Sequence, residues 1–106
     1  VTEGEITIIT INGRLEGTTA PLAAETIEKI LEADCTRMLF DFSELDYLNS
    51  VGLRVLLRAA KKLKQKEGKI VLCSLADYVK EIFEISGFDS VIPISDTVEL
   101  GIKHLS

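Results

Sequence analysis

The stretch "RMLFDFSELDYLNSVGLRVLL", residues 37–57, contains both kinds of element from which the rest of the chain is built. Its first seven residues form a short apolar run that is interrupted only by Asp41. Such a run is typical of a parallel β-strand covered by helices on both faces. From Ser50 onward the pattern changes to helical spacing, and we therefore expect a buried strand followed by an amphipathic helix. The apolar stripe of that helix comprises Leu53, Leu56, Ala60 and Leu63.

The same two patterns recur along the whole chain. Further strands are expected at residues 5–13, 69–74 and 90–94, and further helices at about 18–34, 76–87 and 96–105. Gly68 and Gly87 are the expected helix stops, and Asp96 is the expected cap of the last helix. This alternation predicts one α/β domain over residues 1–106, with a mainly parallel or mixed sheet of four to five strands and about four helices.

Charge is unevenly distributed along the sequence. The formal net charge is −5 and the pI is near 4.8, which argues against nucleic acid as the main partner. Seven of the 12 basic residues nevertheless fall within sixteen positions: Arg54, Arg58, Lys61, Lys62, Lys64, Lys66 and Lys69. This basic face is either an ordinary solvated helix surface or part of a docking surface for an acidic partner.

Several classes of function lack their sequence patterns. No apolar run approaches the roughly 20 residues of a membrane span and no signal-peptide pattern is present, so we expect a cytoplasmic protein without direct membrane insertion. Cys35 and Cys73 lie far apart, and His104 is the single histidine, so the repeated spacing of a zinc site or redox dithiol is missing. Both cysteines are expected to be small apolar residues in or near strands.

Catalytic and cofactor motifs are also missing. The sequence has no GxxxxGK[ST] loop, no GxGxxG fingerprint and no GxSxG elbow, and a Ser50–His104 catalytic pair has little support. Asp41, Glu44 and Asp46 offer oxygen ligands to a cation but lack an EF-hand spacing, which favours a solvated acidic loop. We expect no metal and no cofactor, although ligand sites are common where parallel strands end.

The segment "FDFSELDYLNSVGLRVLL" resembles the signature of the STAS family, the sulfate transporter and anti-sigma factor antagonist domains. The resemblance extends to "INGRLEG" and to "KIVLCSLADYVKEIFEISGFDSVIPISDTVELGI". It implies an anti-sigma factor antagonist that catalyses nothing and binds an anti-sigma factor serine kinase. It also implies that phosphorylation of the motif serine, Ser50, ends this binding and that a PP2C-type phosphatase restores it.

The resemblance places partner binding at Asn49, Ser50, Val51, Gly52 and Arg54. A phosphate on Ser50 would lie at the positive end of a helix, where the fold tolerates it, whereas its charge of about −1.5 to −2 would oppose docking. Ser50 as a purely structural helix cap is the alternative. For Gly52 the two interpretations are close approach of a partner and tight packing of the helix turn on the sheet.

Two residues depart from the family pattern. Phosphorylated members usually carry Asp before the serine and Ser, Thr or Ala after it, whereas this chain has Asn49 and Val51. Asparagine caps a helix equally well, but any role of that carboxylate in phosphoryl transfer is lost. The departure favours a second interpretation, a STAS subunit of a transport or signalling complex that is never phosphorylated. Ser43 and the pair Thr18–Thr19 are weaker candidates for the modified hydroxyl.

Overall fold

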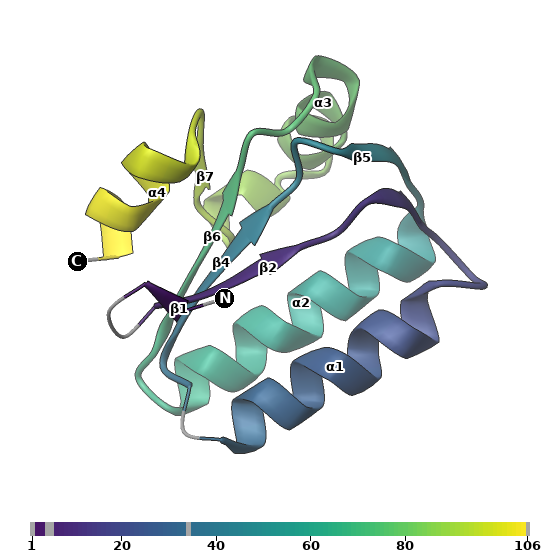
Figure 1. The fold of residues 1–106 in the computed structure, drawn as a ribbon. Coiled ribbons are helices and arrows are strands. Elements are labelled where there is room, and N and C mark those ends of the chain that lie inside the picture. The colour runs from purple at the N-terminus through teal and green to yellow at the C-terminus, as the bar shows by residue number, and fades with distance from the viewer. Residues whose placement is uncertain (1, 4–5, 34, 106) are drawn as a thin grey trace.

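The computed structural model describes residues 2–3, 6–33 and 35–105 (Figure 1). The elements are, in order, β1 (Thr2–Glu3), β2 (Ile6–Thr10), β3 (Gly13–Leu15), α1 (Ala20–Glu32), β4 (Arg37–Asp41), β5 (Leu45–Leu48), α2 (Ser50–Gln65), β6 (Lys69–Cys73), α3 (Asp77–Ser86), η1 (Phe88–Ser90), β7 (Ile94–Ser95) and α4 (Val98–Leu105). The main sheet has the order β1-β2-β4-β6-β7, with β1 antiparallel and the other neighbours parallel. The predicted α/β class is confirmed.

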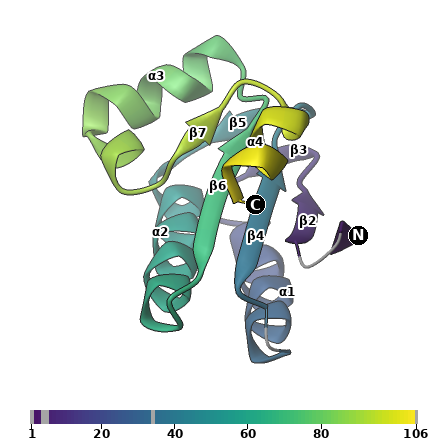
Figure 2. The same cartoon turned by 90° about the vertical axis from the view of Figure 1, so that its left-hand side faces the viewer.

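Helices cover both faces of the main sheet. Helices α1 and α2 pack side by side on one face, and α4 lies on the other (Figures 1 and 2). The strand β4 alternates accordingly, because Met38 and Phe40 belong to the core beneath α1 and α2 whereas Leu39 packs with Leu105 of α4. This arrangement explains the continuous apolar run of residues 38–40, all of which are fully buried.

The helix α2 ends in a Schellman motif, and its left-handed residue is not the glycine that the sequence predicts. Glu67 has φ +59°, its N–H donates to the Lys64 carbonyl over 3.0 Å, and the Gly68 N–H donates to the Leu63 carbonyl over 2.7 Å. Gly68 is needed for a different reason, since a Cβ there would lie 2.5 Å from the Thr36 carbonyl oxygen. Gly87 does have the predicted role, with φ +79° at the end of α3.

Replacing Glu67 with glycine is expected to raise the free energy of unfolding by about 1 kcal/mol, because glycine adopts a positive φ without a Cβ clash. Urea unfolding of the wild type and Glu67→Gly measures this change. As a control, Lys64→Gly lies within the helix and is expected to lower stability by about 1 kcal/mol. Equal losses in both variants would contradict the left-handed conformation of Glu67.

Three expected element boundaries are wrong. The strand predicted at residues 5–13 is shorter, since β2 ends at Thr10 and Gly13, with φ +80°, already begins β3; residue 5 lies outside the described residues. The strand predicted at 90–94 is mostly the turn that follows η1, and only Ile94–Ser95 forms β7. The last helix is capped by Thr97 rather than Asp96, because Thr97 Oγ1 accepts a hydrogen bond from the Leu100 N–H over 3.2 Å.

Both cysteines are free thiols buried in or next to strands, as predicted. Cys73 is fully buried where β6 meets α4. The packing around its sulfur is tight, since a Cβ added to Gly101 of α4 would lie 2.3 Å from the Cys73 Sγ. Burial, reinforced by the negative charges of Asp41 and Glu99, raises the pKa of the Cys73 thiol to about 11.

Stability is therefore expected to fall as the pH rises from 9 to 11. The unfolded chain loses the Cys73 proton near the ordinary pKa of 9.0 while the folded chain keeps it up to about 11, so the free energy of unfolding falls by at most about 2 kcal/mol. Urea unfolding at pH 8 and pH 10.5 measures the fall. The variant Cys73→Ala reports the contribution of tyrosines and lysines, and equal falls in both proteins would contradict the burial of this thiol.

Candidate partner-binding site at the start of α2

The chain enters α2 through a cap made by Asn49. The backbone of Asn49 is extended, and its side-chain Oδ1 accepts hydrogen bonds from the N–H groups of Val51 and Gly52 over 3.0 and 3.2 Å. The Asn49 carbonyl accepts a further bond from the Leu53 N–H over 2.9 Å. Asparagine thus satisfies the first amides of the helix, as its residue type predicts.

Ser50 is the first residue of α2 and its side chain is exposed. Its hydroxyl forms no hydrogen bond with any other residue among those that the structure describes. The cap interpretation of Ser50 is therefore wrong, because the neighbouring Asn49 performs that role. The Ser50 Oγ is free to react or to contact a partner without loss of an internal bond.

The turn that carries Ser50 is hydrogen-bonded to a second, two-stranded sheet, which was not predicted from the sequence. The short strands β3 and β5 pair in parallel, with Leu15 opposite Leu48, and the Asn49 N–H donates to the Leu15 carbonyl over 3.3 Å. Both leucines are buried. The sequence signal for β5 was two apolar residues, Leu45 and Leu48, separated by two residues that are exposed. A pattern of four residues is too short to distinguish a strand from a loop.

Gly52 is buried against this second sheet. A Cβ at Gly52 would lie 2.4 Å from the Leu15 carbonyl oxygen and 2.9 Å from the Leu48 Cδ1. Of the two interpretations of this glycine, the structure favours tight packing of the helix turn. Gly52 thus supports the predicted partner surface from inside, whereas Val51 and Arg54 are exposed beside Ser50.

The acidic residues before α2 lie partly in strands rather than in the predicted loop, since Asp41 ends β4, Asp46 belongs to β5 and only Glu44 lies in the turn between them. The Asp41 carboxylate accepts from the Ser43 N–H over 3.1 Å, and the Tyr78 hydroxyl donates to the Asp46 carbonyl. Glu44 and Asp46 are exposed. Among the described residues, no group of three or more His, Cys, Asp and Glu side chains lies close enough together to hold a metal ion.

Two of the other candidate hydroxyls, those of Thr18 and Thr19, are already hydrogen-bonded, and the histidine lies apart from this site. The Thr19 hydroxyl donates to the Arg14 carbonyl over 2.8 Å, and the Thr18 hydroxyl donates to the Glu16 carboxylate, which holds the pKa of Glu16 below its usual range. His104 lines a surface depression with Lys64 and Gly68, toward the opposite end of α2 from Ser50. A Ser50–His104 pair is therefore not formed.

The basic face of α2 is partly neutralised by α1. Lys62 donates to both carboxylate oxygens of Glu28 over 2.6 Å, and Arg58 lies 3.6 Å from the same carboxylate. This hydrogen bond, with the charges of Lys62 and Arg58, lowers the pKa of Glu28. Arg54 forms no ion pair with another described residue, so its charge remains available at the exposed end of the face.

Comparison with known proteins identifies the fold and its family. The family model of the STAS domain matches residues 1–101. The chain belongs to the STAS domain family. One curated relative is BtrV, a candidate anti-sigma factor antagonist of Bordetella bronchiseptica. The two sequences are 43% identical, and the alignment covers 80% of this STAS domain and 77% of BtrV. The STAS domain is 32% identical over 83% of its length to 77% of the anti-sigma-B factor antagonist of Listeria monocytogenes.

Solved structures agree with the assignment of the fold. The STAS domain aligns over 97% of its length with 89% of a candidate anti-sigma factor antagonist from Thermotoga maritima, at a TM-score of 0.93 and 18% identity. It also aligns over its whole length with 96% of the Bacillus cell fate determinant SpoIIAA in its phosphorylated form, at a TM-score of 0.77 and 19% identity.

In the described part of the STAS domain no helix is long and apolar enough to cross a membrane.

Proposed function

We propose that this STAS domain is an anti-sigma factor antagonist, which binds an anti-sigma factor serine kinase and thereby releases a sigma factor. The names of its relatives support this role, since the relative at 43% identity is described as a candidate anti-sigma factor antagonist and the one at 32% identity as an anti-sigma-B factor antagonist. These partners act on transcription, so the site of action is the cytoplasm. The protein acts by binding and catalyses no reaction of its own.

We further propose that phosphorylation of Ser50 by the bound kinase switches the antagonist off and that a PP2C-type phosphatase switches it on again. One observation carries this proposal: the Ser50 hydroxyl is exposed and unbonded at the first position of α2, while Asn49 alone caps the helix. An added phosphate breaks no internal hydrogen bond and lies at the positive end of the helix dipole. A solved phosphorylated protein of the same fold is consistent with this role.

The phosphate acts on the partner rather than on the fold. It replaces a small neutral group at a docking surface by a solvated anion with about −1.5 to −2 charges. Two unit charges of like sign about 4 Å apart repel by roughly 4 kcal/mol at an effective dielectric constant near 20, and every 1.4 kcal/mol changes affinity about tenfold. Glu44 and Asp46, which precede Ser50 in the chain, are exposed and carry further negative charge in the segment that leads into α2.

The cognate anti-sigma factor tests the proposed role directly. Titration calorimetry is expected to show a complex between this protein and the anti-sigma factor, and gel filtration is expected to show displacement of the sigma factor. A second candidate function, a constitutive STAS subunit of a transport complex, is favoured by Asn49 in place of the usual aspartate. Stable co-purification with a transport ATPase, without any anti-sigma factor complex, would decide for that alternative.

A further inference from the structure

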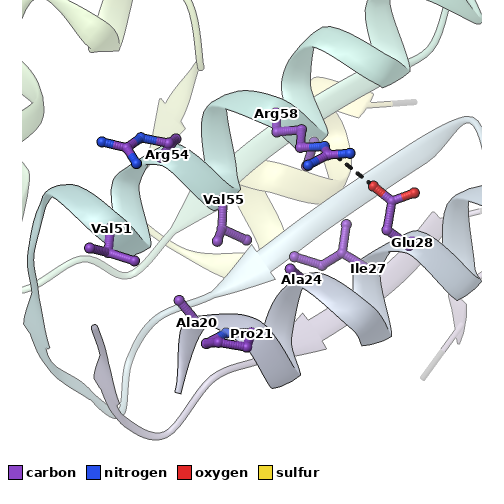
Figure 3. A pocket seen from close by; sticks show the side chains of 10 residues that line it. Ala20, Pro21, Ala24, Ile27, Glu28, Val51, Arg54, Val55 and Arg58 are labelled. Atoms are coloured by element: carbon purple, nitrogen blue, oxygen red, sulfur yellow. Dashed lines mark ion pairs between the residues drawn. The ribbon is translucent and has the colours of Figure 1, made fainter. Parts of the chain in front are cut away.

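A groove between α1 and α2 opens next to the site of Ser50. Its volume is about 250 Å³, and its lining is mostly apolar. Figure 3 shows the aliphatic side chains facing one another across the groove, with the two arginines along the α2 side. The lining comprises Ala20, Pro21, Ala24, Ile27, Glu28, Val51, Arg54, Val55, Arg58 and Ala59.

The size of the groove fits a side chain better than a small-molecule ligand. Ligand pockets usually measure about 300 to 1,000 Å³ and enclose most of the ligand, whereas this groove is smaller and open to solvent. Val51, at one end of the groove, is 37% exposed although it is a large aliphatic residue. An apolar side chain of a docking protein would cover Val51 and Val55 without needing a deep cavity.

The charge at the groove edge selects the chemistry of its occupant. The Glu28 carboxylate is already bound by Lys62 over 2.6 Å, so Arg54 and Arg58 give this edge a net positive charge. The Nε atom of Arg58 lies 3.6 Å from the Glu28 carboxylate, so Arg58 is already partly neutralised. Arg54 has no acidic partner among the described residues. A partner segment in which an apolar residue lies next to an acidic residue matches this site, because the groove lining is aliphatic and the Arg54 guanidinium is available to bind a carboxylate.

We propose that the α1–α2 groove receives an apolar side chain of the anti-sigma factor and that Arg54 binds a carboxylate beside it. This inference rests on the proposed function, and it names the part of the partner that docks and the residues that read it. The groove and Ser50 belong to one surface, because Val51 follows Ser50 in the chain and lines the groove. A partner seated here therefore covers the Ser50 hydroxyl as well.

Arg54 also connects the groove to the phosphorylation state of Ser50. The two residues are four positions apart on α2, so their side chains lie on the same helix face. Helical side chains lean toward the N-terminus, and in Figure 3 Arg54 points away from Arg58 toward the end of α2 that carries Val51. A phosphate on Ser50 forms a charge-assisted pair with Arg54 and thus withdraws this arginine from the carboxylate of the partner.

Charge reversal with a matched control tests the role of Arg54. Binding of the purified anti-sigma factor is measured by calorimetry for the wild type, Arg54→Glu and Lys61→Glu, which alter the charge of α2 equally. Arg54→Glu is expected to weaken binding by about 30-fold or more, whereas Lys61→Glu, which lies outside the groove, changes it by less than about threefold. Equal effects of the two variants would overturn the assignment of Arg54.

Filling the groove tests the apolar part of the proposal. Ala24→Leu places a larger side chain in the groove without loss of helix propensity, and Ala33→Leu makes the same change at the exposed end of α1. Circular dichroism and urea unfolding verify that both variants fold. Ala24→Leu is expected to weaken binding at least tenfold and Ala33→Leu to leave it unchanged. Normal binding by a folded Ala24→Leu would overturn the groove as the docking site.

A double-mutant cycle tests the link between Arg54 and Ser50. If Arg54 pairs with the anion, Ser50→Asp is expected to weaken binding by a factor at least threefold smaller in an Arg54→Gln background than in the wild type. Independent effects would overturn this link. Failure of the wild type to bind the anti-sigma factor would instead overturn the proposed function itself, so the two failures are distinguishable.

Discussion

Replacing Ser50 by aspartate is expected to weaken binding to the anti-sigma factor by about 100-fold, while the protein itself becomes slightly more stable. The exposed hydroxyl has no internal partner to lose, so the new carboxylate enters the docking surface at no structural cost. At the first position of α2 the carboxylate also interacts favourably with the helix dipole, by about 0.5 kcal/mol. Affinity and stability therefore change in opposite directions.

Two further variants at the same position separate charge from size. Ser50→Ala is expected to bind within about threefold of the wild type, because no internal hydrogen bond is removed. Ser50→Gln adds bulk without charge and is expected to fall between alanine and aspartate. Calorimetry gives the affinities and urea unfolding gives the stabilities. Tight binding by Ser50→Asp together with weak binding by Ser50→Ala would show that the hydroxyl itself, and not the absence of charge, is recognised.

Replacing Gly52 by alanine is expected to lower the free energy of unfolding by about 3 kcal/mol. The added methyl group would lie 2.4 Å from the Leu15 carbonyl oxygen and 2.8 Å from the Leu15 Cγ, so β3 or the first turn of α2 must move. Helix propensity alone predicts the opposite sign, a gain of about 1 kcal/mol for alanine over glycine. The direction of the change therefore distinguishes close packing from propensity.

A matched glycine controls for the general effect of this substitution. Gly17→Ala introduces the same methyl group at a position with nothing within 4 Å, and it is expected to change stability by less than about 0.5 kcal/mol. Gly52→Ala is also expected to weaken binding of the anti-sigma factor, since a shift of this turn displaces Ser50. Full stability in Gly52→Ala would contradict the close contact between α2 and the second sheet.

The main elements of the fold are predictable because their signals are local and repeated. The apolar run of residues 37–43 and the stripe from Leu53 to Leu63 each span several residues, and burial on the sheet enforces both patterns. The pair β3–β5 was not predicted, since each strand is three or four residues long and is stabilised by its non-local partner. Helix ends depend on single hydrogen bonds, and for that reason Thr97 rather than Asp96 caps α4.

The candidate site was only partly predictable for a related reason. The resemblance to the STAS signature indicated Asn49 and Ser50, and the structure assigns the helix cap to Asn49 and leaves the Ser50 hydroxyl exposed. The groove beside them was not predicted, because it arises where α1 packs on α2 and depends on small residues such as Ala24 and Ala59. Pairing of Glu28 with Lys62 spans 34 positions and has no sequence signal of its own.

Incubation of the wild-type protein with its anti-sigma factor kinase and ATP tests the central claim most directly. Trypsin releases residues 38–54 as one peptide, which contains both Ser43 and Ser50, and fragment-ion mass spectrometry distinguishes the two serines. One phosphate at Ser50, together with loss of the complex on gel filtration, is the predicted result. A phosphate at any other residue, or a complex that persists after Ser50 is fully phosphorylated, would contradict it.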